Sequence, residues 1–245
     1  MSDDALARLF ARIREESLTT SLEAITFTEA SHDDWRANAK RWDVTPDARL
    51  LSDGRPDLRN AQVIIGGARA TLAIAGDADL RGATIRLVAA DTLVVLGSAC
   101  RLNLVNLEVT GPRGIVAIGA ETTWQSGACQ CHEADQYVLF GDDCMLADQV
   151  LVRTNDGHGI FDRTTKEKIN PASPVVLESH VWIGRRSTVN KGTRVGAGTV
   201  VGGDSVVSGQ LDRNCIYAGI PARKLRDDVV WSRSQAWHDI PERFR

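Results

Sequence analysis

One histidine lies in a segment whose composition suits a catalytic loop. His158 belongs to residues 153–174, a polar stretch rich in Gly, Asn, Thr and charged residues that interrupts a more regular apolar pattern. Polar excursions from a regular scaffold often carry function. Histidine has an ordinary pKa of about 6.5, so near neutral pH it can take a proton from a weak nucleophile such as a hydroxyl. His158 is therefore the candidate general base. The alternative is that His158 is an ordinary loop histidine that serves only packing or solvent contact.

Two further residues could support such chemistry. Asp156 lies two residues before His158 and could orient the imidazole, as carboxylates do in catalytic triads, although a loop aspartate more often forms a turn. Trp182 stands between two apolar residues, so the alternation of a strand directs its ring outward. An outward tryptophan needs a cover. Either a ligand in a groove or packing against residues 153–174 could supply that cover.

The regular scaffold is an apolar ladder with a step of six residues. Because six is even, a strand keeps all members of the ladder on one face, and because six is not a multiple of 3.6, an α-helix does not fit. Gly or Asn follows several members and tolerates the positive φ of a corner. The ladder, clearest from Leu177 to Asp212, predicts three-sided coils stacked into a prism. Its members are Leu177, Ile183, Val189, Val195, Val201 and Val207.

The ladder also sets the expected organisation of the chain, which we predict to be mainly β. Residues 1–60 are expected to form an N-terminal helical cap, with helices over 3–24 and 33–42. Residues 61–212 form the β-helix, irregular up to about 152 and interrupted by the loop 153–174. Residues 213–245 turn off the last coil and form a helix around 222–231.

Composition excludes several classes of function. The net charge of -3, with acids and bases interspersed, gives no basic stripe for nucleic acid. No apolar run approaches the roughly 20 residues needed to cross a bilayer, so membrane insertion is not expected. The first residues lack the basic and apolar regions of a signal peptide, which favours a cytoplasmic protein with reduced cysteines.

The run Cys129-Gln130-Cys131-His132 raises the question of a metal site. Zinc sites usually draw about four ligands from two separated clusters, and the sequence has no second cluster. We therefore expect no metal and reduced thiols in the core. A covalent acyl-enzyme on a cysteine is also disfavoured, since no cysteine lies beside His158 in the sequence.

Four segments carry a resemblance to a known family. They are GDDCMLADQVLVRTNDGHGIFD at 141–162, ESHVWIG at 178–184, VGAGTVVGGDSVV at 195–207 and AGIPARKL at 218–225. The chain resembles the hexapeptide-repeat acyltransferases, most of all the bacterial sugar and capsular-polysaccharide O-acetyltransferases, including the polysialic acid O-acetyltransferase group. The resemblance implies a left-handed parallel β-helix and a homotrimer with acetyl-CoA in the groove between neighbours. It also implies direct transfer of the acetyl group to a hydroxyl of a sugar or polysaccharide acceptor.

The same resemblance assigns roles to residues. It places His158 as the base, Trp182 at the active-site groove and the backbone N–H of Arg185 as a donor to the oxyanion. Many relatives carry Thr-Lys where this chain has Ser208-Gly209, so Arg213 or Lys224 could replace a missing lysine contact to CoA. The residues that the resemblance places at CoA are Gly203, Ser208, Arg223 and Arg226. For the two arginines, the alternative is an ordinary basic face of a C-terminal helix.

Four functions stay open on the same scaffold. The first is an acetyl-CoA-dependent O-acetyltransferase, and the second is an N-acetyltransferase of an amino-sugar or xenobiotic. The third, a metal-dependent hydratase like the γ-class carbonic anhydrases, needs several closely spaced histidines, which this chain lacks. The fourth is an inert prism, against which His158, Trp182 and the GIPAR segment argue together.

Overall fold

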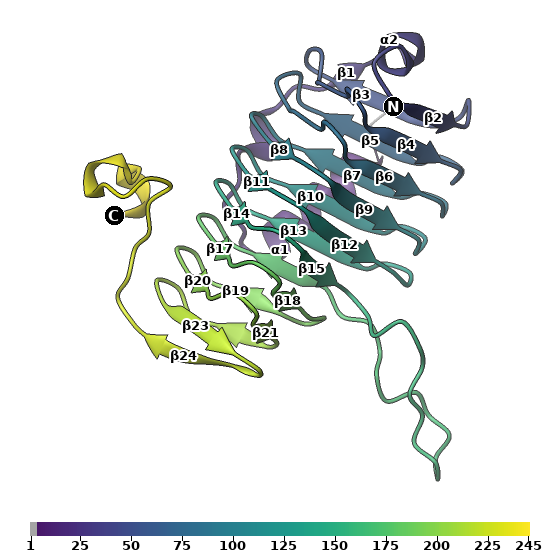
Figure 1. Ribbon diagram of the computed structural model, residues 1–245. Helices are drawn as coiled ribbons and strands as arrows, with labels where there is room; N and C mark the ends of the chain where they lie inside the picture. Colours follow the sequence, from purple (N-terminus) through teal and green to yellow (C-terminus); the bar gives the residue numbers. More distant parts are fainter. Residues whose placement is uncertain (1–3) are drawn as a thin grey trace.

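The computed structural model describes residues 4–245, and these wind into a parallel β-solenoid of about eight turns (Figure 1). Most coils contribute one strand to each of three sheets, of nine, seven and eight strands within the described residues. Along the chain, a coil passes from the nine-stranded to the seven-stranded to the eight-stranded sheet, except where it lacks a strand in the seven-stranded sheet. The prediction of a mainly β protein built from stacked coils is confirmed.

The strands are short, and pairing is parallel except at the two sheet ends formed by β1 and β24. The nine-stranded sheet holds β1 (Thr28–Glu29), β3 (Arg49–Ser52), β5 (Thr71–Ile74), β7 (Leu93–Leu96), β10 (Ile115–Ile118), β13 (Tyr137–Phe140), β16 (Val175–Leu177), β19 (Arg194–Val195) and β22 (Gln210–Leu211). The seven-stranded sheet holds β8 (Arg101–Leu102), β11 (Thr123–Trp124), β14 (Met145–Leu146), β17 (Trp182–Ile183), β20 (Val200–Val201), β23 (Ile216–Gly219) and β24 (Ala222–Arg226). The eight-stranded sheet holds β2 (Arg41–Val44), β4 (Gln62–Ile65), β6 (Thr84–Leu87), β9 (Val105–Val109), β12 (Gly127–Cys131), β15 (Val150–Arg153), β18 (Thr188–Val189) and β21 (Val206–Val207).

The inside of the prism is filled by stacks of aliphatic side chains. The whole six-residue ladder is fully buried, as its spacing predicts. Upstream of residue 153 the coils are longer, and most paired residues lie 22 positions apart, as Arg69 and Asp91 do. After residue 174 most neighbouring coils are offset by 18 positions, as Arg186 and Asp204 are. The change of coil length explains why the six-residue register is broken upstream.

The corners of the prism correct one detail of the sequence interpretation. Positive φ falls three positions after five of the six ladder residues, at His180, Arg186, Gly192, Gly198 and Asp204, and two positions after Val207, at Gly209, but never directly after a ladder residue. The glycines directly after the ladder residues instead allow coils to approach closely. A Cβ on Gly184 would lie 2.5 Å from the backbone nitrogen of Gly203.

An N-terminal helix covers the outer face of the nine-stranded sheet. Helix α1 (Asp4–Glu15) packs Leu9 and Ile13 on outward residues of that sheet such as Val95 and Ala117. Strands β5, β7 and β10 are therefore buried on both faces, so their sequences show no alternation. The helix predicted over 3–24 is too long. It ends at Glu15 because Ser17 adopts a positive φ, and a 3-10 helix, η1 (Ser21–Ala24), follows; residue 3 itself lies outside the described residues.

The rest of the predicted cap region also differs. Helix α2 (His32–Arg36) is shorter than the expected 33–42, and Trp42 lies in strand β2. Strands β2 and β3 already pair with the solenoid, so stacking begins at Arg41, about one coil before the expected boundary at 61.

The C-terminal residues leave the solenoid as a strand and not as the predicted helix. Residues 222–226 form β24, which pairs with β23 and supplies partners to backbone groups at the edge of the last coil. Beyond it the chain turns back along the prism (Figure 1) and ends in two 3-10 helices, η2 (Trp237–Asp239) and η3 (Glu242–Phe244). Among residues 4–245, no helix is long and apolar enough to span a bilayer.

Candidate functional site

His158 lies in an arm, residues 154–174, that leaves the prism after β15 and returns at β16 (Figure 1). The side-chain amide of Asn170 donates 2.9 Å to the carbonyl oxygen of His158, and its oxygen accepts the backbone N–H of Ile160 at 2.6 Å. Asn170 is buried, so it fixes the backbone around His158 while the imidazole itself is exposed. Within residues 4–245 this imidazole has no polar partner, which leaves both ring nitrogens free for a substrate or a neighbouring molecule.

Asp156 is engaged by the scaffold. Its carboxylate accepts 2.6 Å from Nζ of Lys191 and 2.9 Å from the amide of Asn170. These two hydrogen bonds, the one from Lys191 first, lower the pKa of Asp156, so it is ionised at neutral pH. The orienting role toward His158 stays a prediction. Within this chain, the carboxylate of Asp156 instead holds the arm to the turn after β18, through Lys191.

Ser208 belongs to the same corner of the prism as the arm. Its hydroxyl accepts from the amide of Asn190 at 3.2 Å, and Asn190 in turn accepts from Nε of Arg153 at 3.0 Å. These side chains form a short row at the end of the eight-stranded sheet where its strands finish, and the arm begins at the same end. Sequence reasoning missed Lys191, Asn170 and Asn190, because nothing in a single sequence distinguishes such polar side chains from ordinary corner residues.

Trp182 lies on the seven-stranded sheet, in β17. It is partly covered by the ring of Trp231, whose centroid lies 5.8 Å away at an angle of 48°. The cover therefore comes from the C-terminal residues, and the suggestion that residues 153–174 of the same chain supply it is wrong.

Arg185 and Gly203 are neighbours at the next corner. A Cβ added to Gly203 would lie 3.3 Å from the carbonyl oxygen of Arg185, so any side chain at position 203 would crowd this corner. Within residues 4–245 the backbone N–H of Arg185 donates no hydrogen bond. This corner thus presents a free backbone N–H, at Arg185, beside the backbone of Gly203, which no side chain among the described residues covers.

The basic residues near the C-terminus lie on or beside β24. Arg223 and Arg226 are exposed on that strand. Lys224 is engaged by Asp212 at 2.6 Å and Asp227 at 2.9 Å. Arg213 lies at the corner after β22 and lines a cavity of about 270 Å³ together with Phe244 and others. The suggestion that Arg213 or Lys224 replaces the missing lysine contact to CoA stays a prediction.

The candidate residues form two groups on different sides of one prism. The first holds Asp156, His158 and Ser208, where the chain leaves the eight-stranded sheet, and the second is centred on Trp182. No hydrogen bond, ion pair or ring contact in the described part of the chain joins the two groups. The second group comprises Trp182, Arg185, Gly203, Arg223 and Arg226.

The cysteines are core residues. Cys129 and Cys131 point inward from β12 and are fully buried, whereas the side chain of His132 lies partly exposed outside. Burial raises the pKa of Cys131 to about 12, so its thiol is a poor nucleophile. Among residues 4–245, no group of three or more His, Cys, Asp and Glu side chains is placed to hold a metal ion.

Comparisons with known proteins agree on one kind of relative, although no family model matches the chain. A polysialic acid O-acetyltransferase of Escherichia coli O1:K1 is 39% identical over 123 residues, which are 49% of this chain and 38% of that protein. A polysialic acid O-acetyltransferase of Neisseria meningitidis is 34% identical over 155 residues, which are 63% of this chain and 68% of that protein. The chain belongs to the hexapeptide-repeat acetyltransferases.

Solved structures of this acetyltransferase family carry the same fold. The crystal structure of the polySia-specific acetyltransferase NeuO matches with a TM-score of 0.69 and 27% identity over 78% of this chain and 91% of that one. The polysialic acid O-acetyltransferase OatWY shares the fold with a TM-score of 0.61 at 24% identity. These neighbours are left-handed β-helix acetyltransferases, which confirms the family predicted from the sequence. The matched region spans little more than a third of the E. coli relative.

Proposed function

We propose that this protein is an acetyl-CoA-dependent O-acetyltransferase acting on a hydroxyl of a sugar or capsular polysaccharide. The observation that carries the proposal is the exposed imidazole of His158, held on a backbone fixed by Asn170 and without a polar partner in the described chain. A general base must be free to meet the hydroxyl of its substrate. The names of the similar acetyltransferases support the acetyl donor and the glycan acceptor.

The chemistry is a direct transfer. His158 takes the proton of the acceptor hydroxyl as its oxygen attacks the thioester carbonyl, and the backbone N–H of Arg185 donates to the oxyanion that forms. The C–S bond then breaks, and the protonated His158 gives its proton to the departing thiolate of CoA. The bare backbone at Gly203 suits the narrow pantetheine arm, and the exposed guanidinium groups of Arg223 and Arg226 suit its phosphates.

The active unit is a homotrimer with its sites between subunits. His158 and Trp182 lie on different sides of one prism, so a site that uses both needs the arm of one subunit beside the seven-stranded sheet of the next. The arm also exposes Ile160, Phe161 and Ile169 by 53–60%, an apolar surface that a neighbouring subunit would cover. A cytoplasmic location fits the five cysteines, all unpaired and buried.

The test is acetyl transfer to a panel of sialic acid polymers, neutral sugars and amino-sugars, read by mass spectrometry. With the preferred acceptor, His158→Ala should lower kcat by roughly 10²–10⁴-fold, the usual contribution of a positioned base. His238→Ala, a change at a histidine whose side chain is 83% exposed, is the matched control and should retain transfer. Near wild-type transfer by the His158 variant would remove the base assignment, and acetylation of amines alone would make the protein an N-acetyltransferase.

A further inference from the structure

His180 is a buried histidine, 1% exposed, whose two ring nitrogens both face hydrogen-bond acceptors. Nδ1 lies 2.7 Å from a carboxylate oxygen of Asp143, and Nε2 lies 2.9 Å from the carbonyl oxygen of Trp231. A neutral imidazole has a single N–H and can donate to only one of these acceptors. Only the doubly protonated, cationic ring can donate to both acceptors, so this geometry favours that form.

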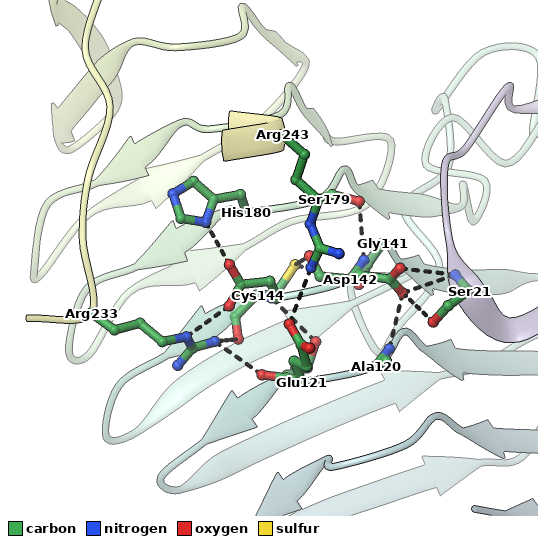
Figure 2. Close-up of polar contacts among 12 residues, drawn as sticks. Ser21, Ala120, Glu121, Gly141, Asp142, Cys144, Ser179, His180, Arg233 and Arg243 are labelled. Carbon is green, nitrogen blue, oxygen red and sulfur yellow. Dashed lines mark hydrogen bonds and ion pairs between the residues drawn. The ribbon is translucent and has the colours of Figure 1, made fainter. Parts of the chain in front are cut away.

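The charges around His180 match a cation. Burial alone would raise the pKa of Asp143, but hydrogen bonds from His180 and Arg233 outweigh it and hold that pKa below its usual value. Arg233 donates 2.7 Å to the second oxygen of Asp143 and 3.0 Å to the carbonyl oxygen of Cys144. The other charged groups nearby are engaged elsewhere (Figure 2). Arg243 pairs with Glu121 at 3.1 Å, and the carboxylate of Asp142 accepts from Ser21. Asp143 is thus a buried anion shared between two cations.

Two aromatic rings of the C-terminal tail, residues 229–245, enclose the imidazole. Trp231 stacks on one side at 4.1 Å and Phe244 stacks on His180 at 4.3 Å, both within 10° of parallel. The indole N–H of Trp231 also donates 2.8 Å to the carbonyl oxygen of His180. Faces of aromatic rings attract cations, so this sandwich favours the protonated ring further.

The same Trp231 ring lies against Trp182, two residues after His180 in the sequence. We propose that protonated His180 is a positioning residue that clamps the C-terminal tail onto Trp182 and so sets that ring for the acyl donor. The inference rests on the proposed function, because it takes Trp182 to line the donor groove. The inference also gives the C-terminal tail a role in positioning Trp182, a role that neither the six-residue repeats nor the arm fills.

The contacts of His180 with the tail depend on a side chain that donates from both nitrogens. A ring with a single N–H would keep one lone pair facing an acceptor oxygen, and one of the two donated hydrogen bonds would be lost. A side chain that cannot donate to both Asp143 and Trp231 should therefore hold the tail less firmly.

The experiment compares wild type with His180→Asn. Position 180 has a φ of +59°, and asparagine tolerates this left-handed backbone, so the variant should fold. It retains a donor for Asp143 and cannot ionise. His238→Asn, on the exposed part of the tail, is the matched control.

The first readout is ¹⁹F NMR of protein labelled with 5-fluorotryptophan, with the signals of Trp182 and Trp231 assigned by substitution of each by phenylalanine. In His180→Asn both signals should shift together away from their wild-type positions, because the tail no longer holds Trp231 against Trp182. Trypsin cleavage after Arg233 should become roughly tenfold faster, in proportion to the loss of a hydrogen bond from a charged group. An unchanged Trp182 signal in the variant would overturn the clamp.

The second readout separates this inference from the proposed function. Wild type should bind CoA in calorimetry, and His180→Asn should raise the KM for acetyl-CoA roughly tenfold with a smaller effect on kcat. A wild type that binds no CoA would overturn the proposed function and the donor role, while NMR would still decide the contact between tail and Trp182. An unchanged KM in a variant whose tail has moved would show that His180 does not position the site.

Discussion

The imidazole of His158 and that of His180 are held in opposite ways. His158 is exposed, and only its backbone is fixed, through Asn170. His180 is buried with both nitrogens engaged. A group that must meet a substrate needs free nitrogens, whereas a group that holds two segments together needs both occupied. This contrast supports the two proposed roles, catalysis for His158 and positioning for His180.

Asp143 predicts how stability depends on pH. Because its pKa is lowered in the folded chain, its contribution is present above about pH 3.9, the value of an unfolded aspartate, and is lost as the pH falls through the folded pKa. Asp143→Asn should therefore cost roughly 1–3 kcal/mol in free energy of unfolding at neutral pH. In urea denaturation across a pH series, the difference from wild type should shrink toward acid. A difference that is constant with pH would contradict the pairing.

At the scale of elements, helix α1 is part of the core and not a detachable cap. The outer face of the nine-stranded sheet is apolar over β3, β5, β7, β10 and β13, and α1 with the residues after it buries that face. Further contacts hold the segment in place. Arg194 binds a carboxylate oxygen of Glu16 at 2.8 Å, and the backbone N–H of Ser21 donates 2.8 Å to Asp142.

Shortening one buried side chain of helix α1 tests the role of this helix. Leu9 is fully buried, so Leu9→Ala should lower the free energy of unfolding by about 2–5 kcal/mol through lost contacts and the cavity left behind. Leu225→Ala, at a residue 66% exposed, is the control and should change it by no more than about 0.5 kcal/mol. Urea or thermal denaturation of both variants measures the difference. Equal effects would mean that α1 is not packed as described.

How far the sequence predicts these elements depends on the range of the interactions. The six-residue ladder is a local pattern, and it identified the inward residues from Leu177 onward. The earlier coils repeat every 22 residues, so Leu72, Val94 and Val116 stack inward at a spacing that a search in steps of six does not detect. A search at that longer period would have found them.

The contacts around the candidate site were beyond sequence reasoning for another reason. Trp231 meets His180 from 51 positions away, and no local pattern encodes that approach. The residues after 221 looked helical from their mixture of apolar and charged side chains, but the free edge of β23 recruits them as a strand. His158 and Trp182 were identified through motifs, whereas their separation on the prism follows only from the coil topology.

On the scale of the whole molecule, one prism carries the proposed base, His158, on one side and the group around Trp182 on another. The apolar surface of the arm and the separation of the two groups both call for neighbouring subunits arranged head to tail, as in a closed ring. In the proposed trimer, each site combines residues from two chains. We expect the acceptor near the arm and the acyl donor along the seven-stranded sheet.

Mixing subunits tests this account most directly. His158→Ala and Trp182→Ala variants should each be inactive alone, because each lacks one half of every site. After joint refolding in equal amounts, random assembly into trimers should restore about a quarter of wild-type acetyl transfer, since that share of interfaces pairs an intact arm with an intact groove. Native mass spectrometry would verify that mixed trimers had formed. Mixed trimers without any recovery of transfer would contradict a site shared between subunits.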